Sequence, residues 1–145
     1  MNDARWIAEL ALHGLIRPSR IFPRQDREFR DLTRNRETLV RTRTTIKNRI
    51  HKILDSAGIR LNVALKDIFG KSGRHLLAGI AEQKDLEATL ATIPSPLILR
   101  RADQLREILQ DSPLSPTQLH LLTTQLHLLE AIEEGAESIA RGDFV

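Results

Sequence analysis

Residues 24–57 read RQDREFRDLTRNRETLVRTRTTIKNRIHKILDSA and contain neither glycine nor proline. Gly58 follows directly, at the position where a helix commonly ends. Apolar residues recur three and four positions apart along the stretch, which is the 3.5-residue repeat of a coiled-coil seam. The sequence therefore predicts one long helix with a face that packs against another helix.

The seam of this predicted helix is mostly apolar but includes two arginines. Because a charged side chain at a seam position must extend to solvent or meet an acid, we expect Arg36 and Arg43 to weaken the middle of the seam and set its register. At about 1.5 Å per residue the helix spans roughly 50 Å, so it must project or pair. Its seam positions are Phe29, Leu32, Arg36, Leu39, Arg43, Ile46, Ile50, Ile53 and Ala57.

A second long helix is predicted from Pro116 to about Arg141, with Ser115 as its N-cap and the proline at its first position. An antiparallel hairpin of the two helices would place Glu133 and Glu137 near Arg36 and Arg43. The second seam consists of Leu119, Leu122, Leu126 and Leu129, followed by Glu133, Ala136 and Ala140.

Shorter elements are predicted around these two helices. A helix capped by Asp3 runs through Leu12, and an extended connector covers residues 17–23. For residues 59–93 the sequence predicts two or three small helices, with a turn at residues 70–73 between them. It predicts one amphipathic helix for residues 97–110 and a turn for residues 111–116. The predicted fold is all-α, a long antiparallel coiled-coil arm with a cap of short helices, divided into segments 1–16, 17–60, 61–111 and 112–145.

Charge is segregated along the chain. Residues 17–60 hold 13 Lys/Arg and 5 Asp/Glu, a net of +8, whereas residues 61–145 hold 8 and 12, a net of −4. The basic segment is suited to phosphate contact, and neutralisation by the acidic part of the same chain is an equally good interpretation. The candidates for phosphate contact are Arg27, Arg30, Arg34, Arg41, Lys47, Arg49 and Lys52.

Composition excludes several other classes. Without cysteine there is no disulfide or thiolate chemistry, and with 3% aromatic residues there is no aromatic platform for bases. No apolar run reaches the roughly 20 residues of a membrane helix, so we expect a cytoplasmic protein. Gly70-Lys71-Ser72 resembles the end of a phosphate-binding loop, but Leu65 occupies the position of the required first glycine. The five histidines form no metal-ligand spacing, and no small-molecule substrate or bound cofactor is expected.

Five short blocks of the chain occur in an order typical of one protein family. They are residues 2–10 (NDARWIAEL), 13–19 (HGLIRPS), 30–34 (RDLTR), 47–52 (KNRIHK) and 67–74 (DIFGKSGR). Together they resemble the central helical region of DEDD-type transposases of the insertion-sequence 110 family, which are related to the Piv DNA invertase. In that family a RuvC-like domain with four acidic metal ligands precedes a coiled-coil region, and a domain with a catalytic serine follows.

The resemblance implies a role in DNA transposition and recombination. Asp3 matches the last acid of the tetrad, which binds Mg²⁺ in the intact family, while residues 1–16 match the end of the RuvC-like domain. The other acids and the serine have no counterpart in the chain. We therefore expect a transposase fragment that keeps the helical dimerisation region, with a second copy or an intact transposase as partner and with DNA or a guide-type RNA on its phosphate-contacting residues.

Two alternatives remain open at this stage. A stand-alone helical interaction protein would pair with and regulate an intact transposase through the same seam, and would be identified by co-purification with it. An enzyme acting alone ranks behind both, because one carboxylate cannot hold the divalent ions of phosphoryl chemistry. Loss of activity in Asp3→Ala would identify it.

Overall fold

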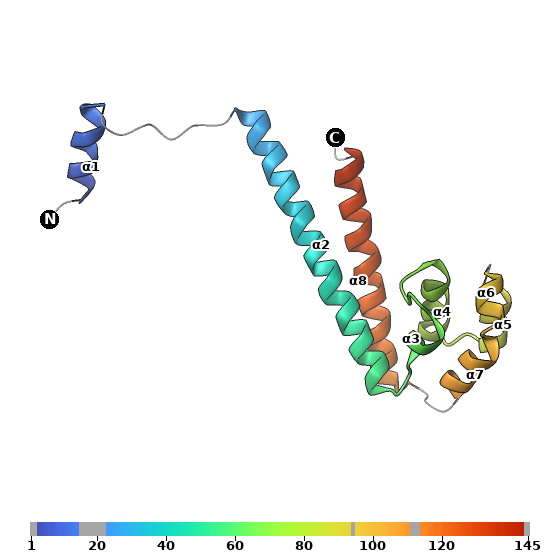
Figure 1. Ribbon diagram of the computed structural model, residues 1–145. Helices are drawn as coiled ribbons and strands as arrows, with labels where there is room; N and C mark the ends of the chain where they lie inside the picture. Colours follow the sequence, from blue (N-terminus) through green and yellow to red (C-terminus); the bar gives the residue numbers. More distant parts are fainter. Residues whose placement is uncertain (1–2, 15–22, 94, 111–113, 144–145) are drawn as a thin grey trace. The chain divides into compact units, whose positions relative to one another are not determined.

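The computed structural model describes residues 3–14, 23–93, 95–110 and 114–143, and among these it contains helices but no strand (Figure 1). This confirms the all-α prediction. The chain divides into two compact units, Met1–Arg34 and Asn35–Val145. The predicted connector at residues 17–23 falls almost entirely outside the described residues, as do residues 111–113 of the predicted turn.

The first unit holds helix α1 (Asp3–Leu12) and the beginning of helix α2 (Arg24–Ser56). Helix α1 has the predicted bounds and ends before Gly14, whose φ of +68° lies in the left-handed region. None of its residues is buried, and Trp6, Ile7 and Leu12 are 58%, 56% and 85% exposed. The apolar side of α1 thus has no cover within its own unit.

Helix α2 ends as the sequence predicts. Gly58 adopts a φ of +75°, its N–H donates to the carbonyl of Asp55, and the N–H of Ile59 donates to the carbonyl of Leu54. This pair of bonds is the Schellman motif, which satisfies carbonyls at a helix C-terminus. Leu54 and Ile59 are both buried, so the apolar contact that commonly accompanies the motif joins the core.

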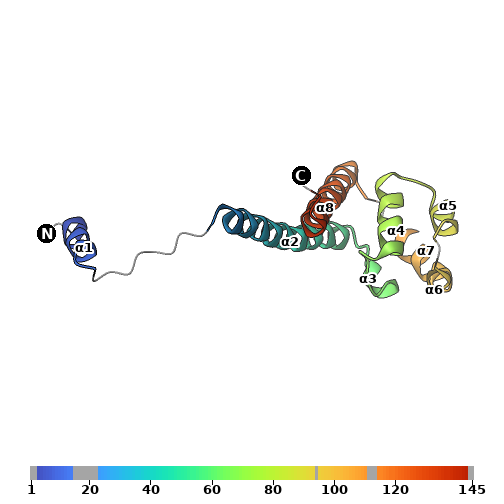
Figure 2. The same ribbon diagram turned by 90° about the horizontal axis from the view of Figure 1, so that it is seen from above.

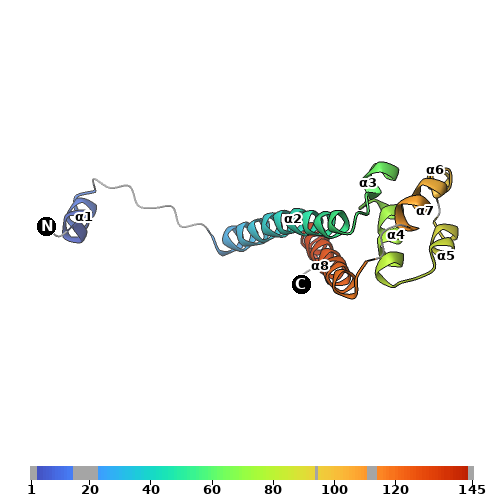
Figure 3. The same cartoon turned by 90° about the horizontal axis from the view of Figure 1, so that it is seen from below.

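The short helices of the second unit form a cap, defined here as α3 to α7. They are α3 (Leu61–Ala64), α4 (Lys71–Ala81), α5 (Leu86–Ala91), α6 (Pro96–Leu99) and α7 (Ala102–Gln110). Figures 2 and 3 show them gathered beside the end of α2 that reaches Ser56. The backbone of α4 approaches α8 and α5 most closely, and α3 approaches α7.

Two predictions within the cap were wrong in detail. Residues 97–110 form two helices because the chain turns at Arg100 and Arg101, where the Arg101 side chain donates a 2.6 Å hydrogen bond to the carbonyl of Ala64 at the end of α3. The predicted turn at residues 70–73 is confined to Gly70, which is the N-cap of α4. Gly73 is helical, and its lack of a side chain lets α4 lie directly against the backbone of Ile68.

Helix α8 (Pro116–Arg141) has the predicted start and end. The Ser115 hydroxyl accepts from the N–H of Gln118, and the Gln118 side chain accepts from the N–H of Ser115, which completes a capping box. Gly142, with a φ of +77°, caps the other end.

Within the second unit, α2 and α8 form an antiparallel helix pair (Figure 1). The Gln118 amide donates to the Ser56 hydroxyl at 3.3 Å, and a methyl group added at Gly135 would lie 3.5 Å from Cδ1 of Leu39. These contacts are 17 positions apart on each helix, so they fix one register. The backbones of α2 and α8 are not among the closest approaches of the unit, so the tight coiled coil of the prediction is not established.

The core of the second unit lies where the helix pair meets the cap. From α2 it takes Ile46, Ile50 and Leu54, and from α8 it takes Leu122 and Leu129. The α2 residues are spaced by four, as in a straight helix of 3.6 residues per turn, so Leu54 is buried where the heptad pattern favours Ile53. Ile53 is half-buried beside it.

Candidate nucleic-acid interface

The long helix α2 presents three different surfaces within the second unit. Its buried side carries Ile46, Ile50 and Leu54, its cap-facing side carries Lys47 and His51, and its remaining circumference is polar and exposed. Each surface is determined by helical spacing, since residues three, four, seven and eleven positions apart lie on one side of a helix.

The cap-facing side joins three helices through one chain of contacts. The Lys47 ammonium lies 5.1 Å from the centre of the Phe69 ring, and the His51 ring meets Phe69 edge-to-face at 5.3 Å. The carbonyl of Phe69 accepts a 2.7 Å hydrogen bond from Nε of Arg74, and the same guanidinium donates to both oxygens of Glu133 at 2.5 and 2.7 Å. We call these five residues the junction.

The electrostatics of the junction follow from that bidentate pair. Hydrogen bonding to Arg74 holds the pKa of Glu133 below its ordinary value, and Lys47 and Arg43 act in the same direction through their charges. The pKa of Arg74 is raised, chiefly by the hydrogen bonds to Glu133. The predicted charge pairing of the two long helices is therefore met in part: Arg43 does act on Glu133, but the direct partner of Glu133 is Arg74 of the cap.

The other predicted pairing acid does not bridge the helices. Glu137 lies 3.9 Å from Arg141 on its own helix, and Arg36 is exposed. Among the described residues, the effect of α8 acids on α2 cations is therefore the charge interaction of Glu133 with Lys47 and Arg43, while its ion pair is with Arg74 of the cap.

The outward side of α2 keeps its positive charge. Arg41, Arg49 and Lys52 are exposed, and none of them forms an ion pair with another described residue. Arg41 and Lys52 are eleven positions apart, so they lie on one line, with Arg49 on its flank. We call these three residues the basic ridge.

The remaining candidates for phosphate contact are placed differently. Lys47 is half-buried at the junction, so it does not share the outward side. Arg27, Arg30 and Arg34 belong to the first unit, where all three are exposed at helical spacing on α2. In the second unit the ridge therefore contains three of the four predicted cations.

The predicted seam residues of α2 and α8 differ in how far the structure buries their side chains. Leu32, Leu39 and Arg43 are half-buried, whereas Phe29 is 71% exposed. On α8, Leu119 and Leu126 are half-buried beside the buried Leu122 and Leu129.

A groove runs between α2 and α8 on the flank away from the junction. Its volume is about 410 Å³. One wall carries Thr42, Thr45, Arg41 and Arg49 of α2, and the other carries Leu128 and Ile132 of α8. This surface was not predicted, although Leu121, Gln125, Leu128 and Ile132 form a second stripe at four-three spacing along α8 that indicates it.

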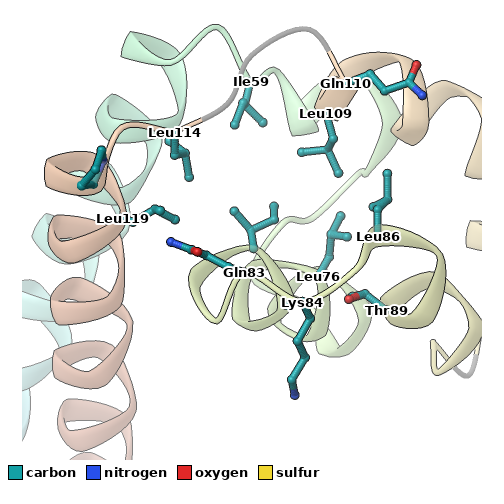
Figure 4. A pocket seen from close by; sticks show the side chains of 13 residues that line it. Ile59, Leu76, Gln83, Lys84, Leu86, Thr89, Leu109, Gln110, Leu114 and Leu119 are labelled. Atoms are coloured by element: carbon teal, nitrogen blue, oxygen red, sulfur yellow. The ribbon is translucent and has the colours of Figure 1, made fainter.

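An apolar pocket of about 500 Å³ lies between the cap and the start of α8 (Figure 4). Leu76, Leu109 and Leu119 point into it, while Lys84 points away and pairs with Glu82 at 2.6 Å. Its described lining contains no carboxylate or imidazole, so it offers no acid–base chemistry.

No metal centre is formed by the residues that the structure describes. Asp3 is exposed in the first turn of α1, and no group of three or more potential His, Cys, Asp or Glu ligands converges anywhere in the described ranges. The residues present do not fit the Mg²⁺ site of the family resemblance, so the role of Asp3 stays a prediction. Of the described helices, none is both long and apolar enough to cross a membrane.

Comparison with known proteins finds a family match over the first part of the chain. Residues 1–59 match the family model of the DEDD-type transposases of the insertion-sequence 110 family, whose description is transposase. The match confirms the resemblance drawn from the sequence blocks, and it ends at the residue that completes the Schellman motif of α2. No curated protein and no solved structure matches the chain.

Proposed function

With residues 1–59 assigned to the DEDD-type transposases of the insertion-sequence 110 family, we propose that this chain acts in DNA transposition by holding nucleic acid on helix α2. The basic ridge would neutralise phosphates of DNA or of a guide-type RNA. Catalysis is not part of this proposal, because Asp3 has no converging carboxylates among the described residues.

One observation carries the proposal. Among the residues that the structure describes, the ridge cations have no acidic partner, whereas other cations of the same unit do: Arg74 pairs with Glu133 and Arg106 pairs with Glu87 and Asp103. Unpaired, exposed cations aligned on a rigid helix match the regular negative charge of a nucleic-acid backbone.

The test compares two triple variants of equal charge. Arg41→Gln/Arg49→Gln/Lys52→Gln removes the ridge, and Arg60→Gln/Lys66→Gln/Lys71→Gln removes three exposed cations outside α2. Binding of a fluorescent 30-base-pair duplex and of the matching RNA is followed by anisotropy as salt is varied.

We expect the ridge variant to lower the slope of log K against log salt for DNA by about 2 to 3, near 0.9 per lost phosphate contact. The control variant should change it by less than about 1. Equal losses in the two variants would mean that only net charge matters, and no affinity at low salt would contradict the proposal altogether.

Helical association is a second component, and α1 supports it. Trp6 and Ile7 are neighbours on α1 and both are exposed, and large exposed apolar side chains of this kind pack against another polypeptide. Leu12 is exposed as well, on a different side of the helix. We propose that this partner is a second copy or the intact transposase. The sequence placed this association on the α2 seam, but Ile46 and Ile50 of that seam are buried within the second unit of the same chain. If the partner is the intact transposase, the chain would act as the stand-alone helical interaction protein that regulates it.

Sedimentation of the full chain over a hundredfold concentration range tests self-association. Trp6→Glu should shift a dimer toward monomer, and Arg5→Glu, an exposed neighbour on the same helix, serves as the control. A monomer at all concentrations excludes the dimer, and absence of co-purification with an intact transposase would then exclude the regulator as well.

A further inference from the structure

We propose that the groove between α2 and α8 receives a single nucleic-acid backbone strand, so that α8 contributes to binding as well as α2. This inference rests on the proposed function and specifies where the phosphates lie. The strand would run along the groove with its phosphates on the arginine edge and its sugars over the apolar wall of α8.

The charge of the groove is asymmetric. Arg41 and Arg49 line the α2 edge, and no acidic residue is part of the described lining. None of the four acids near the C-terminal end of α8 is in this lining. Glu133 is at the junction, Glu130 acts electrostatically on Arg74 of the same junction, and Glu137 lies beside Arg141. An anion can therefore enter the groove without meeting a carboxylate of its lining.

The spacing of the two arginines suits one strand. Eight residues separate them, which is about 12 Å along the helix axis. On one strand of B-form DNA that distance covers three to four phosphates, at about 3.4 Å along the duplex axis for each. Both guanidinium groups can thus contact the same strand.

The apolar wall of the groove favours an occupant that has apolar surface beside its phosphates. Leu128 lines the groove with 43% of its surface exposed, and Leu121 one heptad earlier is 44% exposed. Sugars and base edges supply apolar surface beside each phosphate. A second copy of this chain fits less well, because a two-fold arrangement would bring the arginine edges of both copies to one interface.

Two threonines provide a matched test. Thr42 lines the groove and Thr44 does not, and because they are two positions apart they lie about 200° apart around α2. Both are exposed, and the hydroxyl of each donates a hydrogen bond to the carbonyl four residues earlier. Thr42 donates to the carbonyl of Thr38 at 2.8 Å, and Thr44 donates to the carbonyl of Val40 at 3.4 Å. Thr42→Glu and Thr44→Glu therefore change charge and helix propensity alike, but only the first places its carboxylate in the groove lining. Because Thr44 lies three positions from Arg41, its glutamate can weaken binding slightly as well, so the difference between the two variants is a lower bound.

The experiment measures binding of the full chain to a fluorescent 20-nucleotide single strand at low salt. We expect Thr42→Glu to weaken binding about tenfold and Thr44→Glu about twofold or less, because a carboxylate in the groove repels the strand at close range. Leu128→Ala should weaken binding about threefold with an unchanged salt slope, since it removes apolar contact and no charge.

Other outcomes separate this inference from the proposed function. Arg41 and Arg49 belong to both the ridge and the groove lining. Equal effects of Thr42→Glu and Thr44→Glu, with the ridge variant still defective, would therefore place the nucleic acid on the outer face of the ridge, away from α8, and overturn the groove. Absence of binding by every form would overturn both. If a helical Leu/Glu heptad peptide, and not the oligonucleotide, binds and shows the loss specific to Thr42→Glu, the groove takes an acidic protein helix and the inference is wrong.

Discussion

The cap and the helix pair of the second unit are packed by different means. In the cap, α4 comes so close to the preceding chain that the Cβ of an alanine at position 73 would lie 2.2 Å from the carbonyl oxygen of Ile68. In the pair, α2 and α8 are held apart by their side chains, and Leu39 reaches toward Gly135 with room for another carbon atom. Close backbone packing holds the start of α4 against the segment before it, whereas side-chain packing between α2 and α8 leaves the groove that we propose for nucleic acid.

Gly73→Ala should produce the largest change in stability. The added carbon would meet the Ile68 backbone, which cannot move aside as a flexible side chain can, so we expect a loss of about 3 kcal/mol in the free energy of unfolding. Urea denaturation followed by circular dichroism measures it. Gly70→Ala is the control, because its φ of −68° suits alanine and the nearest atom would lie at 3.4 Å. A loss at Gly73 no greater than at Gly70 would show that the cap is looser than described.

Glu133→Gln should have the next largest effect, because it breaks the ion pair that links the cap to α8. The side chains of Arg74 and Glu133 are 33% and 20% exposed, so the pair is partly shielded from water. We expect a loss of about 2 kcal/mol, as for a charge-assisted bidentate pair. A double-mutant cycle with Arg74→Gln isolates the coupling, and the exposed pair of Arg106 and Glu87 is a control in which coupling should be smaller. Equal coupling in the two pairs would contradict the special role of the junction.

The same pair predicts a dependence of stability on acid. The pKa of Glu133 is lowered from 4.5 by the Arg74 hydrogen bonds, so its contribution is complete above pH 4.5 and is lost as pH falls through the lower folded-state value. Unfolding free energies between pH 6 and pH 3 should fall more steeply for the natural chain than for Glu133→Gln. Glu87→Gln controls for another carboxylate with a lowered pKa, which is bonded to Arg106, and Glu82→Gln controls for the third, which is bonded to Lys84. Parallel curves for the natural chain and Glu133→Gln would exclude the linkage.

Local signals predicted the long helices well. Ser115 and Pro116 mark the start of α8, and Gly58 and Gly142 mark helix ends where a left-handed residue is needed. These features depend on neighbours in sequence, so they can be inferred from sequence alone. The all-α class follows from the same local patterns.

Contacts distant in sequence were the main source of error. Nothing local indicates that Arg74 binds Glu133, 59 residues later, or that the side chain of Arg101 reaches the carbonyl of Ala64. The outward cations of α2 were predicted as a group, but Lys47 turned out to face Phe69, a residue that no helical period places there. Periodicity predicts which residues lie on the same side of a helix. Which other part of the protein packs against that side depends on tertiary contacts, which periodicity does not predict.

Gly135→Ala is the smallest change and acts in the opposite direction from Gly73→Ala. Gly135 is in the interior of α8, where alanine is favoured over glycine by about 0.8 to 1 kcal/mol, and its new methyl group would make an ordinary contact with Leu39 at 3.5 Å. We expect a gain of about 1 kcal/mol in the free energy of unfolding with no loss of nucleic-acid affinity. Leu39→Ala in the same background should remove only the part of the gain that comes from contact. If Gly135→Ala instead destabilises the chain, α2 and α8 lie as close together as the elements of the cap, and the contrast between side-chain and backbone packing fails.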